Sequence, residues 1–124
     1  MARIKYERAY DIQILVRKIA RKLEMTYIEQ GNVVCFRSSG SRAKGTIARC
    51  WALPVILQQA LNTKPCYAIE VIGERFDKLS QNEKEKVIIH EMLHIPKAFG
   101  GGLKMHGYVD NKRISEAFKK WKYL

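Results

Sequence analysis

Residues Leu79 to His106 read LSQNEKEKVIIHEMLHIPKAFGGGLKMH, and this stretch decides how the rest of the chain is interpreted. It contains the HExxH pattern His90-Glu91-Met92-Leu93-His94 and holds all three histidines of the protein. Residues four apart lie on the same face of an α-helix, so His90 and His94 can offer imidazole nitrogens to one ion. Glu91 is offset by about 100° around the helix, so its carboxylate can accept a proton from water without being a ligand. The pattern therefore predicts a metal site on a helix.

The flanking residues predict that this helix runs from Gln81 to about Ile95. Ser80 and Glu83 have the spacing of a capping box. Pro96 ends the helix because the residue before a proline is pushed out of the α region. The helix is apolar nearly all the way round, which is typical of a helix buried in a core. Its polar residues would need partners there, and a divalent cation would supply them. Histidines that bond backbone carbonyl groups are the alternative.

Length and composition predict one domain over residues 1–124 with a single modest core, because 47% of the 124 residues are hydrophobic. No run of about 18 apolar residues is present, so no membrane span is expected. The first residues mix both charge signs and lack the apolar stretch of a signal peptide, which predicts a cytoplasmic protein. The cysteines lack a CxxC pair and are expected to be reduced core thiols: Cys35, Cys50 and Cys66.

The formal net charge of +11 favours contact with polyanions. Nucleic acid or nucleoprotein is therefore a candidate partner through the basic surface. No recognition motif for nucleic acid accompanies the charge, and an ordinary solvated surface is the alternative.

The rest of the chain predicts an α+β fold. An apolar stripe with helical spacing predicts a helix from Lys5 to Leu23. Two short strands, Thr26 to Glu29 and Val33 to Arg37, are expected to meet at a Gly31-Asn32 turn. The remaining elements are expected to be a polar loop from Ser38 to Gly45, a strand from Thr46 to Leu53, a short helix from Pro54 to Leu61 with Pro54 in its first turn, a strand from Cys66 to Ile72, and a last helix around Ile114 to Trp121.

The strand from Cys66 to Ile72 comes just before the HExxH helix. It could pair with an extended peptide by strand addition, or it could be an internal strand of the sheet. The sequence leaves both interpretations open.

A catalytic zinc site normally has three protein ligands and leaves the fourth position for water. His106 is the predicted third ligand, because the glycines at 100–102 accept backbone angles that would let the chain turn back across the metal. Glu116 on the following helix and Asp110 are the competing candidates. The HExxHxxGxxH signature is absent, since Lys97 occupies its glycine position, which excludes a metzincin on its usual spacing.

The segment from Phe76 to His106 resembles predicted zinc metallopeptidases found in archaea and in some phages. Their pattern is a FDxLS-type lead-in, a helix with HELLHIP or a similar motif, a glycine-containing loop and a downstream histidine. The resemblance extends upstream through three further segments, Tyr6 to Ile12, Ala48 to Leu53 and Tyr67 to Ile72. It implies a minimal zincin-like domain, in which a small mixed or antiparallel sheet packs on the HExxH helix with helices at the N- and C-termini.

The same resemblance implies that His90, His94 and His106 bind Zn²⁺ and that Glu91 is the catalytic base. The chain is also similar, more distantly, to SprT-like proteases, which act on proteins bound to DNA. That similarity rests on the HExxH pattern and on the later pair His106-Gly107.

Two functions are predicted from these features. The first is a zinc-dependent metallopeptidase that hydrolyses a peptide or protein substrate with a zinc-activated water and Glu91 as general base. The alternative is a basic, zinc-stabilised module that binds nucleic acid or nucleoprotein with little or no catalysis. Glu91 distinguishes them, because a structural zinc site has no use for a general base. Tyr108, close to His106 in the sequence, is a candidate for stabilising an oxyanion.

Overall fold

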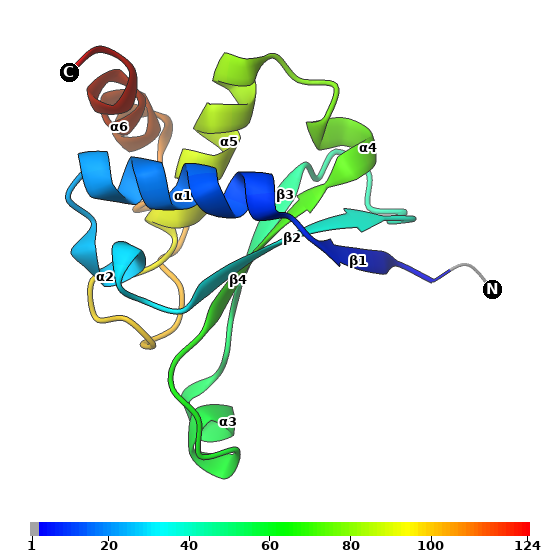
Figure 1. Cartoon of the computed structure of the whole chain (residues 1–124), viewed down its shortest axis with the longest axis vertical. Coiled ribbons are helices and arrows are strands. Elements are labelled where there is room, and N and C mark those ends of the chain that lie inside the picture. The colour runs from blue at the N-terminus through cyan, green and yellow to red at the C-terminus, as the bar shows by residue number, and fades with distance from the viewer. Residues whose placement is uncertain (1–2) are drawn as a thin grey trace.

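The structure, a computed structural model, describes residues 3–124. Within this range four strands form one mixed sheet that is accompanied by six helices, so the predicted α+β class is confirmed (Figure 1). In chain order the elements are β1 (Lys5–Arg8), α1 (Tyr10–Lys22), α2 (Thr26–Glu29), β2 (Val33–Ser39), β3 (Ala48–Ala52), α3 (Val55–Ala60), β4 (Tyr67–Ile72), α4 (Gly73–Phe76), α5 (Gln81–Leu93) and α6 (Asn111–Tyr123). None of these helices has the length and apolar character needed to cross a membrane.

The sheet has the strand order β1-β2-β4-β3. β2 and β4 run parallel to each other, whereas β1 and β3 pair antiparallel with their neighbours. Two parallel strands need a long connection between them, and here that connection contains β3 and α3. β4 is therefore an internal strand, and β1 and β3 are the edges of the sheet.

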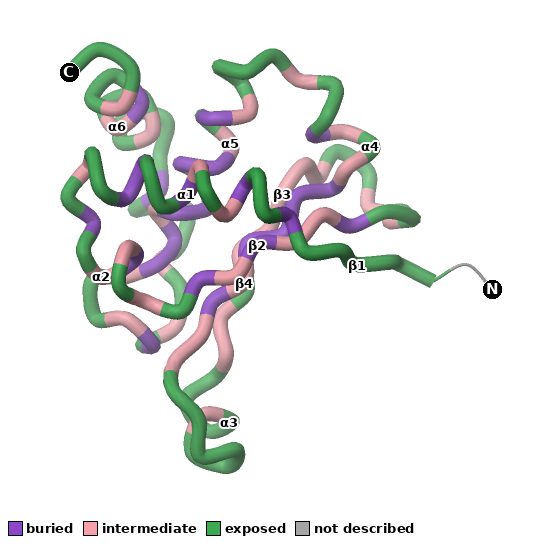
Figure 2. Tube along the Cα trace, in the orientation of Figure 1, coloured by how far each residue is buried: buried purple, intermediate pink, exposed green. Residues whose placement is uncertain are grey.

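The core lies on the face of the sheet that α1 and α5 cover (Figure 1). The strands contribute alternating residues to this face, including Cys35 of β2, Ile69 and Val71 of β4, and Cys50 of β3. Figure 2 shows that buried residues gather where these helices meet the strands. Of the predicted core cysteines, Cys35 is buried in this core and Cys50 packs against it, whereas the half-buried Cys66 lies outside it. Burial raises the pKa of Cys35 and of Cys50 to about 12, so both thiols stay protonated at neutral pH.

Helix α5, which carries the HExxH pattern, begins at the predicted capping box. The Ser80 hydroxyl oxygen accepts a hydrogen bond from the Glu83 N–H, and the Glu83 carboxylate accepts one from the Ser80 N–H, both at 3.2 Å. The helix ends at Leu93, slightly before the predicted Ile95, and His94 is its C-cap. The end that bears the histidines is therefore the point where the chain leaves the helix.

Helix α6 packs against α5 through a buried carboxylate. Glu85 of α5 accepts hydrogen bonds from Trp121 Nε1 at 2.8 Å and from Lys122 Nζ at 2.7 Å. Asp110 is the N-cap of α6, and its side chain accepts a hydrogen bond from the Arg113 N–H at 2.9 Å. The predicted C-terminal helix is thus present, and it begins earlier than the apolar pattern alone indicates.

The predicted helix from Lys5 to Leu23 is wrong in its first part. Residues 5–8 form the edge strand β1, and α1 begins only at Tyr10. The buried stripe of α1 starts at Ile12, so no apolar pattern upstream favours a helix over a strand. Pairing with β2, in a register that places Tyr6 opposite Ser38, determines the conformation there.

The predicted strand from Thr26 to Glu29 is also wrong, because these residues form the short helix α2. Glu24, with φ of 58°, follows the end of α1 in the left-handed region, and the chain then turns so that Ile28 enters the core. The backbone of Gly31 then passes close to the Tyr27 carbonyl oxygen, with which a Cβ at this position would collide. The expected hairpin at this glycine does not form, and β2 pairs with β1 and β4 instead.

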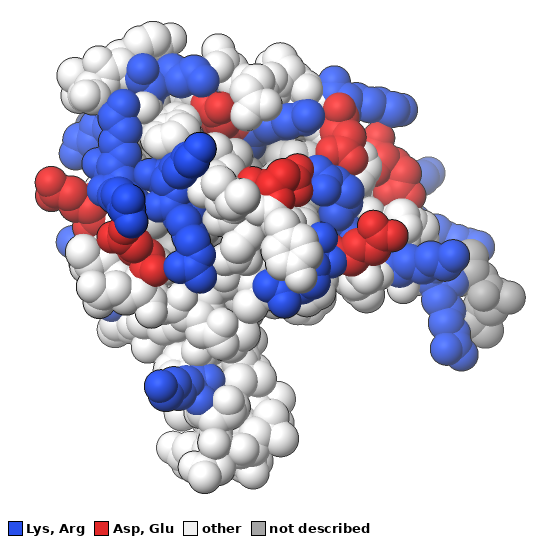
Figure 3. All heavy atoms as spheres, in the orientation of Figure 1, with Lys and Arg blue, Asp and Glu red and all other residues white. Residues whose placement is uncertain are grey.

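The remaining predicted elements are present with shifted bounds. The strands expected at 46–53 and 66–72 are β3 and β4, and the helix expected at 54–61 is α3, which has Pro54 as its N-cap rather than in its first turn. β2 continues to Ser39, so the polar loop begins later than predicted. α3 lies on a projection, where Ile56 and Leu61 are exposed. Figure 3 shows this projection almost free of charge, whereas Lys and Arg are spread over the rest of the visible face.

Replacing Ser80 with alanine should lower the free energy of unfolding by about 1 kcal/mol, because the change removes the capping hydrogen bond at the start of α5. Ser115→Ala is the matched control, since Ser115 is exposed within α6 and alanine is the better helix former there. Urea unfolding of both variants measures the difference. Equal stability of the two variants would contradict a stabilising cap at Ser80.

Candidate metal centre

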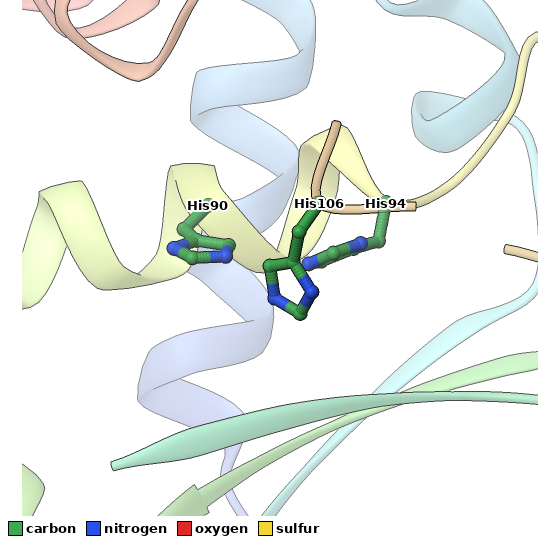
Figure 4. A group of neighbouring side chains, drawn as sticks. All are labelled: His90, His94 and His106. Carbon is green, nitrogen blue, oxygen red and sulfur yellow. The ribbon is translucent and has the colours of Figure 1, made fainter. Parts of the chain in front are cut away.

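Three histidines from two parts of the chain meet at one place (Figure 4). His90 lies in α5 and His94 at its end, and His106 comes from the loop between α5 and α6. Their candidate ligand nitrogens all lie within 4.8 Å of one another. The ring centroids of His94 and His106 are 4.8 Å apart, and His90 lies 5.1 Å and 5.6 Å from these two. The structure thus brings together the histidines that the sequence singles out.

The loop that carries His106 is held by Tyr67, a buried residue of β4. The Tyr67 hydroxyl donates a hydrogen bond to the Gly102 carbonyl oxygen at 2.6 Å and accepts one from the Gly100 N–H at 3.1 Å. Gly100 and Gly102 have φ values of 99° and 89°, which residues with a Cβ rarely adopt. The glycines therefore allow the return of the chain that the sequence predicts. Sequence reasoning missed Tyr67, because its role depends on a contact far along the chain.

The same loop orients the imidazole of His94. His94 Nδ1 lies 2.6 Å from the Lys104 carbonyl oxygen, and the Lys104 N–H donates to the His94 carbonyl oxygen at 2.7 Å. A carbonyl oxygen can only accept, so Nδ1 carries the proton and Nε2 keeps its lone pair. A hydrogen bond of this kind orients metal-binding histidines and increases their basicity. Burial, together with the neighbouring His94 and His106, lowers the pKa of His90, which favours its neutral, ligating form.

The histidines line a cavity of about 550 Å³ between α5 and the edge strand β3. Glu91 lies in the wall of this cavity, makes no ion pair within residues 3–124, and is buried. Burial raises the pKa of its carboxyl to about 7, so this group can exchange a proton near neutral pH. The other lining residues are Gly45, Thr46, Ile47, Ala48, Arg49, Cys50, Trp51, Val87 and Leu103.

The strand beside this cavity is β3, and the interpretation of the strand at 66–72 as a pairing partner for a substrate is wrong. That strand is β4, and β2 and β3 occupy both of its edges. Its residues Tyr67 and Ile69 to Ile72 are buried, as is typical of an internal strand. β3 instead carries Arg49 and the exposed Trp51. The polar Arg49 within this strand was the sequence signal that could have indicated an edge strand.

The three imidazoles fit a zinc ion at a catalytic type of site. Zn–N bonds of about 2.0–2.1 Å in a tetrahedron place the ligand nitrogens roughly 3.3 Å apart. The candidate nitrogens lie within 4.8 Å of one another, so they would move closer together to bind one ion. Three imidazoles at the side of a cavity would leave the fourth position accessible, as catalytic zinc sites require.

A family model described as "Putative phage metallopeptidase" matches residues 4–124. The chain belongs to the phage metallopeptidase family. The matched range includes α5, the loop with His106 and all four strands, and it confirms the family resemblance of the sequence. Neither the curated proteins nor the solved structures that were searched contain a match to the chain.

In this chain the competing candidate ligands lie away from the histidines. Glu116 lines a separate cavity together with Tyr108 and Arg113, and Asp110 serves as the N-cap of α6. Tyr108 has Lys104 Nζ and Arg113 Cζ each 4.2 Å from its ring centroid. Tyr108 is not part of the lining of the histidine cavity, so the geometry gives it no part in stabilising an oxyanion there.

In the metal-free protein, Glu91→Gln should become more stable than the wild type as pH rises. The folded-state pKa of Glu91 is about 7, above the ordinary 4.5, so the wild type loses stability as pH rises through this range and the neutral amide does not. The difference in unfolding free energy should grow by on the order of 3 kcal/mol between pH 4.5 and 8. Urea unfolding with a chelator present measures it.

Glu116→Gln is the control for this series, because Glu116 is an exposed glutamate on α6. Its stability relative to the wild type should change little over the same pH range. The same pH dependence in both variants would contradict a burial cost at Glu91.

Proposed function

We propose that this protein is a zinc-dependent metallopeptidase that hydrolyses peptide bonds in a peptide or protein substrate. The observation that carries the proposal is the convergence of His90, His94 and His106 beside the buried Glu91. Membership of the phage metallopeptidase family supports both the metal and the type of bond.

In this proposal the three histidines hold the zinc ion and Glu91 moves the proton. The chemistry that zinc supplies when bound is a lowered pKa for water and polarisation of a carbonyl group. Glu91 accepts a proton from the water and passes it to the departing amine. Burial raises the pKa of the Glu91 carboxyl in the metal-free protein, which moves it toward the range in which a general base works best.

The free edge of β3 gives an extended substrate a place to bind. Residues Ala48–Ala52 pair with β4 on one side only, and Ala48, Arg49 and Cys50 also line the histidine cavity. A peptide that adds to this edge as a further strand would form main-chain hydrogen bonds that do not depend on its sequence. Such a peptide would run along the opening of the cavity, where Glu91 and the histidines can act on it.

The alternative function, a zinc-stabilised binding module without catalysis, has less support from the geometry. A structural zinc site usually closes all four coordination positions with protein ligands. Here the described residues place only His90, His94 and His106 together, at the side of an open cavity. A structural site would also gain nothing from Glu91, which is buried, costly to charge, and without an ion-pair partner in the described part of the chain.

Glu91→Gln should abolish hydrolysis and leave zinc content near one ion per chain. Loss of a general base typically costs about 10²–10⁴ in rate. The measurement is cleavage of a fluorescence-quenched peptide library by zinc-loaded protein, followed by mass spectrometry of the products. Wild-type cleavage by the Glu91→Gln variant would contradict the role of Glu91 as base.

His106→Ala should weaken zinc binding strongly, because it removes a ligand. Removing a residue that only hydrogen-bonds to a ligand typically lowers metal affinity by roughly 10–100-fold, and the loss here should be larger. Glu116→Ala should leave zinc affinity unchanged, because Glu116 lines a different cavity. Competition with a chromophoric chelator measures both affinities. The opposite result, with Glu116→Ala losing zinc and His106→Ala keeping it, would make Glu116 the third ligand.

A further inference from the structure

The sheet has a second face, opposite the core, that carries aromatic and basic side chains. Because side chains alternate along a strand, residues paired across strands share a face. The register pairs Tyr6 with Ser38, Arg8 with Phe36, Trp51 with Ala68 and Arg49 with Glu70. The residues between them, such as Cys35 and Ile69, face α1 and α5. Figure 1 shows no helix of the described chain packed on this second face. We call it the aromatic face.

Large aromatic side chains on this face are left in contact with solvent. Tyr6 is 56% exposed and Trp51 is 51% exposed. Together with Phe36, Ala68 and Glu70 they surround a shallow cavity of about 470 Å³. An uncovered group of aromatic rings on a sheet indicates a binding surface, since monomeric proteins usually bury such groups.

A buried hydrogen-bond network fixes the position of Trp51. Its Nε1 donates to Glu70 Oε1 at 2.9 Å, and the Ser38 hydroxyl donates to Glu70 Oε2 at 2.6 Å. Glu70 is only 2% exposed, so its carboxylate is occupied by these donors rather than directed at a ligand. The indole is therefore held in place before any ligand binds, which reduces the entropy lost on binding.

Arg8 supplies positive charge beside the rings, and Arg49, which shares this face by its register in β3, also lines the histidine cavity. The Arg8 guanidinium lies 5.8 Å from the centroid of the Phe36 ring and 5.1 Å from that of Tyr10. Neither Arg8 nor Arg49 forms an ion pair within residues 3–124. Unpaired arginines among exposed aromatic rings match a ligand that carries both flat rings and negative charge.

We propose that the aromatic face binds single-stranded nucleic acid. Bases would stack on Tyr6, Phe36 and Trp51, as they do on aromatic residues of sheet surfaces that bind single strands. Phosphates would contact Arg8 and Arg49, in keeping with the net charge of +11. A duplex fits less well, because its bases are already stacked and paired. The inference does not depend on the proposed peptidase activity, although β3 contributes to both surfaces.

The test is fluorescence anisotropy with labelled twelve-residue oligothymidylate and oligouridylate at low salt, and with a duplex of the same length. Metal-free Glu91→Gln protein is used, so the result does not depend on hydrolysis. Both single strands, or one of them, should bind more tightly than the duplex. The stronger of the two identifies whether the ligand is DNA or RNA.

Tyr6→Ala and Phe36→Leu should each weaken binding at least about fivefold, the lower end of the effect of losing one stacked base. Neither residue lines the histidine cavity. Tyr123→Ala is the matched control, because Tyr123 is an exposed tyrosine on α6, where 72% of it is accessible. This variant should bind the oligonucleotides as tightly as the wild type does. Thermal unfolding checks that every variant is folded. If Phe36→Leu lowers stability, Tyr6→Ala still tests the inference, because Tyr6 lies at an exposed position on the edge strand.

Charge is tested separately, because basic residues cover much of the protein surface. Arg8→Gln should weaken binding clearly more than Lys119→Gln, which removes one positive charge on α6. Equal effects of these two variants, equal binding of duplex and single strand, or no binding by the parent protein would overturn the proposal. Light scattering provides a further test. If the protein is a dimer that Tyr6→Ala dissociates, and the same change leaves oligonucleotide affinity unaltered, a second copy of the chain occupies the face and the proposal is wrong.

Discussion

The two hydrogen bonds of the Tyr67 hydroxyl determine where the third histidine can lie. They join an internal strand of the sheet to the carbonyl oxygen of Gly102 and the N–H of Gly100, and the Tyr67 ring also packs edge-on against Phe99 at 4.8 Å. Together with the hydrogen bonds between Lys104 and His94, they hold the loop against the end of α5, where His106 lies beside the histidines of the helix. A metal centre with ligands from two segments needs such a constraint, because small displacements of one segment would separate the ligand atoms.

The alternation of side chains in the sheet gives its two faces different tasks. One face supplies the core on which α5 rests, and β3 at the edge of the sheet lines the cavity of Glu91 and the histidines. The other face leaves Tyr6 and Trp51 exposed over the buried Glu70. Both the burial of an unpaired glutamate and the exposure of aromatic rings work against stability. Features that cost stability in a small fold point to a part in binding or catalysis.

Much of the candidate site could be predicted from the sequence because its determinants are local. The spacing of the histidines, the capping box at Ser80 and the glycines before His106 each act within a few residues. The errors lie where distant pairing decides: β1 is a strand because β2 is beside it, and α2 forms because Ile28 reaches the core. The position of β3 at the edge, and the contact of Tyr67 with the loop, likewise depend on strand order and on residues far along the chain.

The most direct test of this account is zinc K-edge X-ray absorption of the purified protein loaded with one equivalent of zinc. The account predicts four-coordinate zinc with three imidazole nitrogens and one further light atom at about 2.0–2.1 Å. It also predicts that His106→Ala lowers the imidazole count by one. A sulfur scatterer at about 2.3 Å, which would indicate a thiolate such as Cys50, or zinc that is not held at all, would contradict a centre built from three histidines.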